Sequence, residues 1–267
     1  MTPTLLEGRF DRTLAVTGPV RLEVETDAGT VRVSTGEAGA VRVRGIVRAR
    51  SSLFGLVDPE SHIQEIEENP PIEQDGNRIR VTDRVSNGLF SGHPTILLDI
   101  TVPPDTSVRA KADSGGIRIE GVQGPVECST DSGFVEVVGA GSRVKAQADS
   151  GRIEIRQATG PVQAEVDSGD IQVLEIGGEI EVKSDSGEIQ LSQTVAARVR
   201  VQADSGRIRL RLAPGAGYTL RAKSDSGHIQ VPEMSRQRSS KHEVFGDIHG
   251  GGPSVQIQVD SGDIDIE

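Results

Sequence analysis

The stretch with the clearest chemical potential is KADSGGIRIEG, residues 111–121. Its Asp-Ser-Gly-Gly string surrounds the nucleophilic serine of trypsin-like proteases, which makes Ser114 a candidate nucleophile. Such a serine occurs once in an enzyme, with one base and one oxyanion hole. Here Asp-Ser-Gly occurs eight times, and the aspartates lie 18, 18, 18, 18, 19, 21 and 35 residues apart. This periodicity is typical of a repeat architecture and predicts that Ser114 is a turn residue.

The aspartates of these triplets could instead bind calcium, because they would form a column if the repeats stack. Calcium β-rolls have 18-residue coils, but they use a Gly-Gly-x-Gly-x-Asp nonapeptide that this sequence lacks. Ca²⁺ also takes about six to eight oxygen ligands, and each repeat offers one aspartate. We therefore favour plain turn chemistry, in which Asp starts the turn and Gly supplies a positive φ. The less favoured calcium column consists of Asp113, Asp131, Asp149, Asp167, Asp185, Asp204, Asp225 and Asp260.

The other reactive residue types form no recognisable catalytic or metal-binding motif. The five histidines show no HExxH spacing, and the sequence contains no GxSxG elbow, P-loop or dinucleotide fingerprint. The one cysteine, Cys128, excludes an internal disulfide. Its position in the repeat points inward, so we expect a buried, unreactive thiol. We predict no cofactor and no enzymatic activity.

Two groups of residues are candidates for contacts with a partner. An insertion at residues 232–253 is locally basic in an acidic chain, and insertions in repeat proteins form loops that often bind ligands. Two apolar stretches, residues 52–56 and 88–92, could form an exposed patch. We favour a solvated loop for the insertion and packing against an end cap for the apolar stretches. The candidate partner-binding residues are Arg236, Arg238, Lys241, His242, Phe245, Phe54 and Phe90.

Each repeat contains two short strands that would position these residues. In residues 149–166, DSGRIEIRQATGPVQAEV, apolar and polar residues alternate on both sides of a Gly-Pro turn, which predicts half-buried strands. A meander or sandwich would also fit the alternation. Only stacked coils explain why each column of the repeat keeps one class of residue. We predict an all-β, single-stranded β-solenoid (β-helix), right-handed, with two-strand coils of about 18 residues and a short capping helix.

Stacking also predicts which outward side chains become neighbours. The predicted opposite-charge pairs are Arg152 with Asp170, Glu188 with Arg207, Glu127 with Lys145, and Glu165 with Lys183. Glu136 beside Glu154 is a like-charge exception. Exposed pairs contribute only about 0–1 kcal/mol each, so they favour register more than stability. The terminal DIDIE strand is expected at an exposed sheet edge, where its carboxylates would block edge pairing.

We expect one continuous domain in two portions. Residues 1–105 form the N-terminal portion of the solenoid, which begins with a worn repeat in which Asp27-Ala28-Gly29 replaces the triplet. Residues 106–267 hold the regular coils and the insertion.

The N-terminal portion contains signals for a capping element. Asp58-Pro59 is a helix start and Pro70-Pro71 a stop, which predicts a helix at about 59–68 that covers an open end of the solenoid. Strands are expected near 77–83 and 95–102.

The composition fits a thin interior and argues against several partners. Aromatic residues make up 2% of the chain and Trp is absent, so Ile, Val, Leu and Ala must fill the core. A net charge of −11 argues against nucleic acid and against anionic membrane surfaces. No apolar run reaches the length of a membrane span, and the opening MTPTLLEGRF lacks the features of a signal peptide.

Several stretches together resemble the toastrack-type adhesin domain family of bacteria. They are LDITVPPDTSVRAKADSGGIRIEGVQGPVECSTDSG, the repeated SG-x-I-x-V, FGDIHGGGPSVQIQVDSGDIDIE, NPPIEQDGNRIRV and the opening EGRFDRTLAVTGPVRLEVETDAGTVRV. The resemblance covers nearly the whole chain. It implies a β-helical envelope or surface protein of extracytoplasmic location, and it supplies no catalytic residues.

The hypothesis that follows is a non-enzymatic structural or binding module of the bacterial cell envelope, adhesin-like in role. Its partner would be an envelope polysaccharide or another envelope protein. One alternative is a polysaccharide-active β-helix enzyme that uses paired carboxylates. The other is a regulatory protein-interaction module of an envelope-stress system, bound through Phe54 and Phe90.

Overall fold

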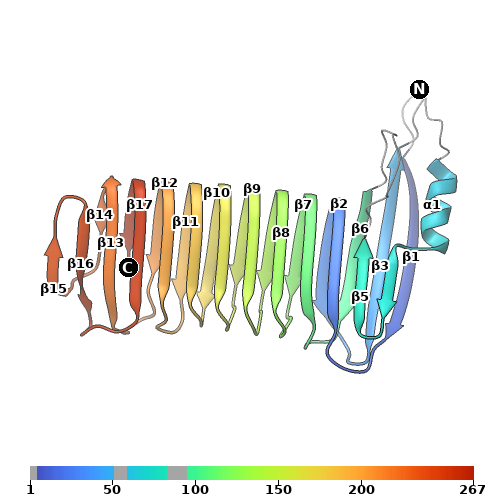
Figure 1. Ribbon diagram of the computed structural model, residues 1–267, viewed down its shortest axis with the longest axis horizontal. Coiled ribbons are helices and arrows are strands. Elements are labelled where there is room, and N and C mark those ends of the chain that lie inside the picture. Colours follow the sequence, from blue (N-terminus) through green and yellow to red (C-terminus); the bar gives the residue numbers. More distant parts are fainter. Residues whose placement is uncertain (1–4, 51–58, 83–94) are drawn as a thin grey trace.

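The computed structural model describes residues 5–50, 59–82 and 95–267. Figure 1 shows its strands side by side along one long axis, with a helix at one end. The regular body is built from long strands of common construction. They are β7 (Ser107–Glu120), β8 (Val126–Val138), β9 (Val144–Arg156), β10 (Val162–Ile176), β11 (Ile180–Gln193), β12 (Val199–Arg211) and β17 (Ser254–Ile266).

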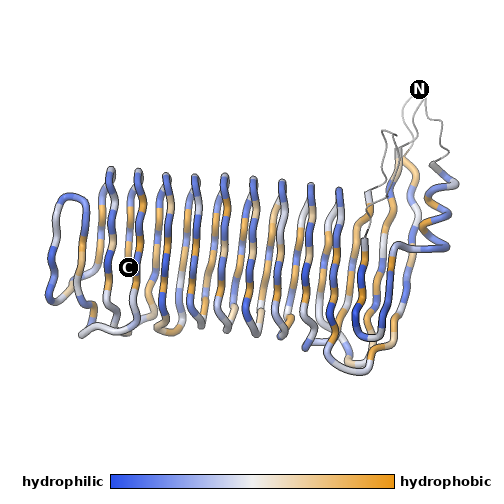
Figure 2. The backbone as a smooth tube through the Cα atoms, viewed as in Figure 1, coloured by the Kyte–Doolittle hydropathy of each residue, from blue (hydrophilic) through white to orange (hydrophobic). Residues whose placement is uncertain are grey.

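Each of these strands bends at its Asp-Ser-Gly triplet into two arms. We call the residues before the triplet the first arm and those after it the second arm. In β9, Val144 and Ala146 of the first arm and Ile153 and Ile155 of the second arm are fully buried. The polar residues that alternate with them are only partly buried, and Figure 2 shows hydrophobic and hydrophilic residues alternating along the coils. The two predicted strands of a repeat are therefore the two arms of one bent strand.

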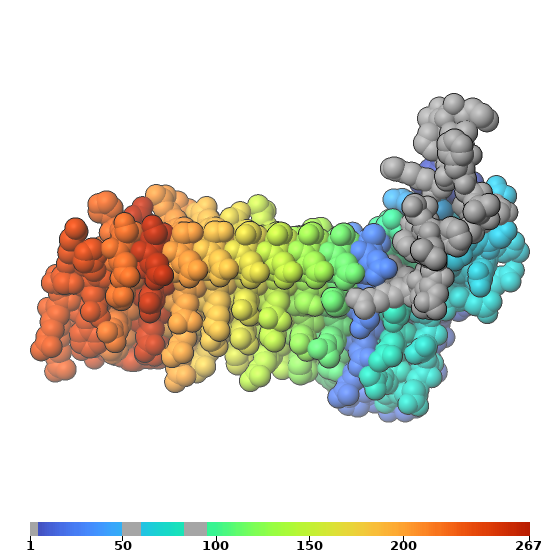
Figure 3. All heavy atoms as spheres, turned by 45° about the horizontal axis from the view of Figure 1, so that its top comes forward, coloured from blue at the N-terminus to red at the C-terminus, as the bar shows by residue number. Residues whose placement is uncertain are grey.

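Successive coils pair in parallel and in register. Ser132 of β8 lies opposite Ser150 of β9, and Ile153 of β9 lies opposite Ile171 of β10. This stacking of equivalent positions confirms a β-solenoid-like fold and shows that the antiparallel meander is wrong. Figure 3 shows the coils packed closely along the long axis of the molecule.

The interior follows the predicted columns. Positions four and six residues after the triplet aspartate are buried in β7 to β12 and in β17. The coil formed by β13 (Tyr218–Ser226) and β14 (Ile229–Gln230) is the exception. Its Ile229 and Val231 are only partly buried, because this coil stands next to the end of the stack.

The triplet makes the corner between the arms. The glycine takes a positive φ, 144° at Gly151, which residues with a side chain rarely adopt. The serine can also bond sideways: Ser205 Oγ donates to the backbone carbonyl of Asp185 at 3.2 Å. At Ser186 and Ser205 the corner thus links a coil to its neighbour as well as turning the chain.

The N-terminal portion places its coils out of sequence order. Its elements are β1 (Leu5–Ala15), β2 (Arg21–Thr35), β3 (Ala40–Arg50), α1 (Pro59–Glu68), β4 (Ile72–Asp75), β5 (Arg78–Thr82) and β6 (Thr95–Val102). The worn repeat, β2, pairs in parallel with β7 on one side. On its other side its first arm pairs with β5 and its second arm with β6. The strands predicted near 77–83 and 95–102 therefore form one coil outside β2.

The helix α1 covers the end strand β1, as predicted for a cap. Ile63 and Ile66 of α1 are buried in the common core, and Glu67 Oε1 accepts a 2.6 Å hydrogen bond from the backbone N–H of Arg9. The Arg12 guanidinium donates to the carbonyl oxygens of Glu67 and Glu68 at 2.8 and 3.1 Å. These contacts satisfy the last helical carbonyls and shield the outer edge of β1.

The C-terminal strand does not lie at an edge, which corrects the sequence-based expectation. β17 pairs with β12 on one side and with β13 and β14 on the other. After β12 the chain leaves one strand position open and continues with β13 in the position beyond it. The last strand, β17, then occupies the open position between β12 and β13. The carboxylates of the DIDIE strand therefore lie between neighbouring coils, where Asp263 pairs with Arg207 at 3.5 Å.

The insertion is a hairpin that extends the sheet, and not a solvated loop. β15 (Ser235–Ser239) pairs antiparallel with β16 (Glu243–Ile248), which pairs antiparallel with β13. In Figure 1 this hairpin stands at the opposite end of the molecule from α1. Among the described residues, β15 is the edge strand of that end. It is short, carries arginines and contains a register shift, all features that block edge pairing.

Candidate functional site

The triplet serines form a structural ladder. Ser132, Ser150 and Ser168 lie opposite one another in consecutive coils, and Ser114 continues the row toward β2. A nucleophile needs a base within hydrogen-bonding distance, and no histidine bond to these serines is found in the described part of the chain. Ser114 is therefore placed as the turn residue that its repetition predicts.

The triplet aspartates stand on the outside of the corners. Asp131, Asp149 and Asp167 are exposed at successive levels of the stack. Asp225 pairs with Lys223 at 2.8 Å. Across the described ranges no three His, Cys, Asp or Glu side chains converge as a metal ion would require. Each coil contributes one triplet aspartate to the column. Calcium binding by this column stays an untested prediction.

The hairpin brings together the predicted basic residues. Arg236, Arg238, Lys241 and His242 are all exposed on β15 and the turn that follows it. His242 is anchored, since its Nδ1 lies 3.2 Å from the carbonyl oxygen of Ser224. Arg236 Nη1 lies 3.9 Å from Asp247. The structure places these residues on a hairpin, which the sequence analysis did not predict, and their role in binding stays a prediction.

Phe245 lies within this cluster as an exposed aromatic side chain. Its exposed fraction is 40%, and it faces outward because its neighbours Val244 and Gly246 are the buried positions of β16. In the sheet it stands between Arg238 of β15 and Arg221 of β13. An aromatic face between two guanidinium groups is a suitable surface for a ligand that has both apolar and anionic parts.

The other predicted aromatic pair, Phe54 and Phe90, lies outside the described residues. Their packing against the cap and their role in binding remain predictions.

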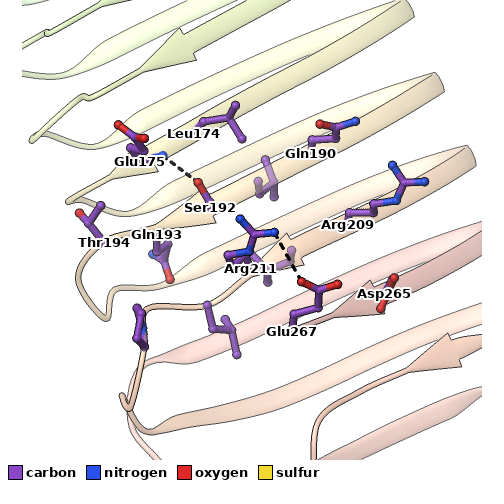
Figure 4. Close-up of a pocket in the computed structure, with 14 residues that line it drawn as sticks. Leu174, Glu175, Gln190, Ser192, Gln193, Thr194, Arg209, Arg211, Asp265 and Glu267 are labelled. Carbon is purple, nitrogen blue, oxygen red and sulfur yellow. Dashed lines mark hydrogen bonds and ion pairs between the residues drawn. The ribbon is translucent and has the colours of Figure 1, made fainter.

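A hollow lies on the second arms, near the turns that connect the coils (Figure 4). It encloses about 680 Å³ and is lined by residues of β10, β11, β12 and β17. Arg211 pairs with Glu267 at 3.6 Å, and the backbone N–H of Glu175 donates to Ser192 Oγ at 2.8 Å. No aromatic side chain lines it. The hollow therefore lacks the stacking surface expected at a polysaccharide-cleaving site.

The sequence reasoning missed Phe134 on the second arm of β8. Its side chain is 38% exposed and lies over Gly116 of β7, where a Cβ would come within 2.2 Å of the ring. The signal was available, since Phe134 occupies an outward position that holds Arg152 in the next coil. It borders a hollow of about 550 Å³.

Two carboxylates beside Phe134 are held in ion pairs. Glu136 lies between Arg118 and Arg156, with its Oε1 3.0 Å from Arg156 Nη2 and its Oε2 2.7 Å from Arg118 Nε. Glu154 pairs with the same Arg156 at 2.7 Å. The like-charge neighbours predicted from the sequence are thus bridged by a shared arginine.

The predicted outward neighbours are all in register, but not all form ion pairs. Their pairing in adjacent coils confirms the stacking. Arg152 and Asp170 lie 3.8 Å apart. Glu188, in contrast, pairs with Arg209 at 2.6 Å and not with Arg207. A long side chain can contact a residue two positions further along the neighbouring strand, so the strand register alone does not determine which ion pairs form.

Cys128 is the buried thiol that the sequence predicts. Its exposed fraction is 1%, and burial raises the pKa of the thiol far above its ordinary value, with a further contribution from Glu127. A thiol in this state is a weak nucleophile.

These observations define the class of the protein as a β-solenoid-like repeat protein with a helix at one end and a hairpin at the other. Its described surface carries paired charges and a few exposed aromatic side chains. The helix α1 is ten residues long, too short and too polar to cross a membrane. The described ranges contain no helix that could span one.

The chain belongs to the Toastrack DUF4097 family, whose model matches residues 20–267. This confirms the resemblance drawn from the sequence. No curated protein matches the chain.

Three solved structures match the chain at low sequence identity. A candidate adhesin from Bacteroides fragilis is 10% identical, with 97% of each chain covered and a TM-score of 0.54. A candidate cell adhesion protein from Clostridium sporogenes is 10% identical, with 99% of each chain covered and a TM-score of 0.29. A candidate lipid-binding protein from Parabacteroides distasonis is 11% identical, with 96% of each chain covered and a TM-score of 0.39. At this identity the first of these likenesses shows the fold alone.

Proposed function

We propose that this chain is a non-enzymatic structural and binding module of the bacterial cell envelope or surface, with an adhesin-like role. The observation that supports the proposal is that most apolar residues are buried between the coils, whereas two aromatic side chains remain exposed. The apolar residues are used for stacking, while Phe134 and Phe245 stand exposed among arginines on the outer faces. Exposed aromatic and arginine side chains are typical of recognition surfaces.

The fold also suits a spacer that presents such surfaces away from an attachment point. Each coil contacts its neighbours through in-register parallel pairing, so the stack is expected to be stiff along its length. We infer right-handed coils, the hand strongly preferred for parallel strand connections. An extracytoplasmic location agrees with the adhesin descriptions of similar structures.

A polysaccharide-active enzyme is the second candidate, and the Glu136–Glu154 pair beside Phe134 is the feature that favours it. Two neighbouring carboxylates and an aromatic platform are the parts that glycoside hydrolysis needs. Glu136, however, is held by Arg118 and Arg156, and Glu154 is held by Arg156. A general acid must be free to reach the leaving-group oxygen of the substrate, and arginine side chains already contact both carboxylates. We therefore favour binding without turnover.

The test is cosedimentation of the purified protein with envelope fractions of the bacterium that encodes it, combined with an assay for released reducing sugar. We expect binding and no sugar release. Sugar release by the wild type that is abolished in Glu136→Gln would establish the enzymatic candidate. Absence of binding to every fraction would contradict the binding module.

A further inference from the structure

The two arms of the solenoid differ in how their arginines are paired. On the second arms from β7 to β12, every arginine has an ion pair of 3.8 Å or shorter with a carboxylate. These arginines are Arg118, Arg152, Arg156, Arg207, Arg209 and Arg211. The second-arm face is therefore internally neutralised.

The first-arm face carries guanidinium groups that lack such partners. Arg143, Arg198, Arg200 and Arg238 are exposed, and none forms an ion pair with a described residue. Arg221 lies among them and pairs with Glu243 at 2.6 Å. We call these five residues the arginine strip. It is a local cationic surface on a chain whose net charge is −11.

The strip is continuous across the coils. Arg143, Arg198 and Arg200 line a depression of about 360 Å³, and Arg200 also lines a second depression of about 320 Å³ with Arg221. In the sheet register, Arg200, Gln256, Arg221, Phe245 and Arg238 follow one another across adjacent strands. Neighbouring strands lie about 4.8 Å apart, so the arginines of this row recur about every 10 Å.

The residues between the arginines favour a hydroxylated ligand. Gln202, Gln256 and Gln258 line the second depression, and an amide side chain both donates and accepts hydrogen bonds, as sugar hydroxyls do. Glu179 and Glu181 line the first depression, which lowers its positive charge. A spaced row of guanidinium groups with amides between them suits a polymer of moderate charge density more than a nucleic acid.

We propose that the arginine strip binds a linear acidic polysaccharide, with the guanidinium groups on its carboxylates and Phe245 against the apolar face of a sugar ring. This assignment deepens the proposed binding function and rests on it. It names the first-arm face between β9 and β15 as the recognition surface and an acidic glycan as the ligand class.

The test measures binding of the full chain to alginate, a linear polyuronate, and to carboxyl-reduced alginate as the uncharged match. We expect binding to alginate that weakens with salt and little binding to the reduced polymer. The double variant Arg200→Gln/Arg238→Gln should weaken alginate binding by about tenfold or more. The control Arg21→Gln/Arg32→Gln removes two exposed arginines of β2 that form no ion pair with a described residue and should leave binding unchanged.

Equal binding of both polymers, equal losses in both double variants, or tighter binding of double-stranded DNA than of alginate would overturn the assignment. Absence of alginate binding would also overturn it. If the protein does not bind alginate but still binds envelope fractions, the proposed binding function stands and only the acidic-glycan assignment is wrong. If it binds neither, both the assignment and the proposed function are wrong. Far-ultraviolet circular dichroism of each variant checks that the stack is intact.

Discussion

A Cβ atom on Gly151 would lie 1.8 Å from the carbonyl oxygen of Gly133 in the neighbouring coil. The two glycines belong to successive triplets, and Gly151 also has a positive φ of 144°. The corner therefore admits only glycine for two independent reasons, backbone conformation and the close approach of the next coil.

Substitution of Gly151 by alanine should destabilise the stack strongly. The clash forces neighbouring coils apart, and we expect a loss of roughly 3 kcal/mol or more in the free energy of unfolding. Gly215→Ala is the matched control, because Gly215 has a φ of 70° and open space where a Cβ would lie. It should lose only about 1 kcal/mol. Equal losses in urea denaturation would show that the contact between coils is unimportant.

The buried thiol of Cys128 should resist modification in the folded protein. Its side chain faces the narrow interior, and its pKa is raised by burial. A thiol-exchange reagent should titrate no thiol under native conditions and one thiol per chain after unfolding in guanidinium. Rapid labelling of the native protein would mean that the coils around β8 open readily.

The side chain of Tyr218 should contribute a measurable buried hydrogen bond. Its hydroxyl accepts from the backbone N–H of Ala213 at 3.1 Å and donates to Gln193 Oε1 at 3.2 Å. Tyr218→Phe leaves both groups buried without this partner, and we expect a loss of about 1–3 kcal/mol. Thermal melts of the variant and wild type measure it. An unchanged melting temperature would show that water replaces the hydroxyl.

Stability at acid pH should depend on Glu23. Hydrogen bonds from Arg78, and secondarily from Arg80, hold the pKa of Glu23 below its ordinary value. Because the pKa is lowered on folding, the stabilisation is present above the unfolded pKa of about 4.3 and is lost as pH falls through the folded value. Glu23→Gln should therefore lower the melting temperature at pH 7, and this difference should shrink as the pH falls below about 4.

The control for the pH series is Glu37→Gln, which changes an exposed carboxylate that has no ion pair with a described residue. Its melting temperature should follow that of the wild type across the series. A Glu23→Gln difference that stays constant with pH would show that packing, and not charge, accounts for the effect.

The coil geometry could be predicted from the sequence because two independent features of the repeat, its turn triplet and its apolar positions, indicate the same coil length. The Asp-Ser-Gly corner and the apolar columns have the same spacing, so Ser132 opposite Ser150 and Ile153 opposite Ile171 follow from counting. The helix at Pro59–Glu68 could be predicted because its start and stop residues are local signals.

The order of the end coils could not be predicted in the same way. The interval between Asp225 and Asp260 has the same length whether the inserted residues form a loop or a hairpin. Only tertiary pairing places β17 between β12 and β13 and leaves β15 at the edge. The ion pairs of the outer faces were also beyond the sequence, because Glu188 reaches Arg209 diagonally and passes over Arg207.

The candidate binding surface was predicted in part. The basic insertion drew attention to Arg238 and Phe245, but the arginine strip joins them to Arg200 and Arg221 only through the pairing of β13, β16 and β17. Charge counting along the chain does not show which arginines lack partners. That distinction depends on side-chain positions across three or four strands.

The most direct measurement is cosedimentation with envelope polysaccharide from the encoding bacterium, for wild type, Arg200→Gln/Arg238→Gln and Arg21→Gln/Arg32→Gln. We expect wild type and the β2 control to bind alike, and we expect the variant of the arginine strip to lose most of its binding. Equal binding of all three proteins, or no binding by any, would contradict the claim that the first-arm face between β9 and β15 is a recognition surface.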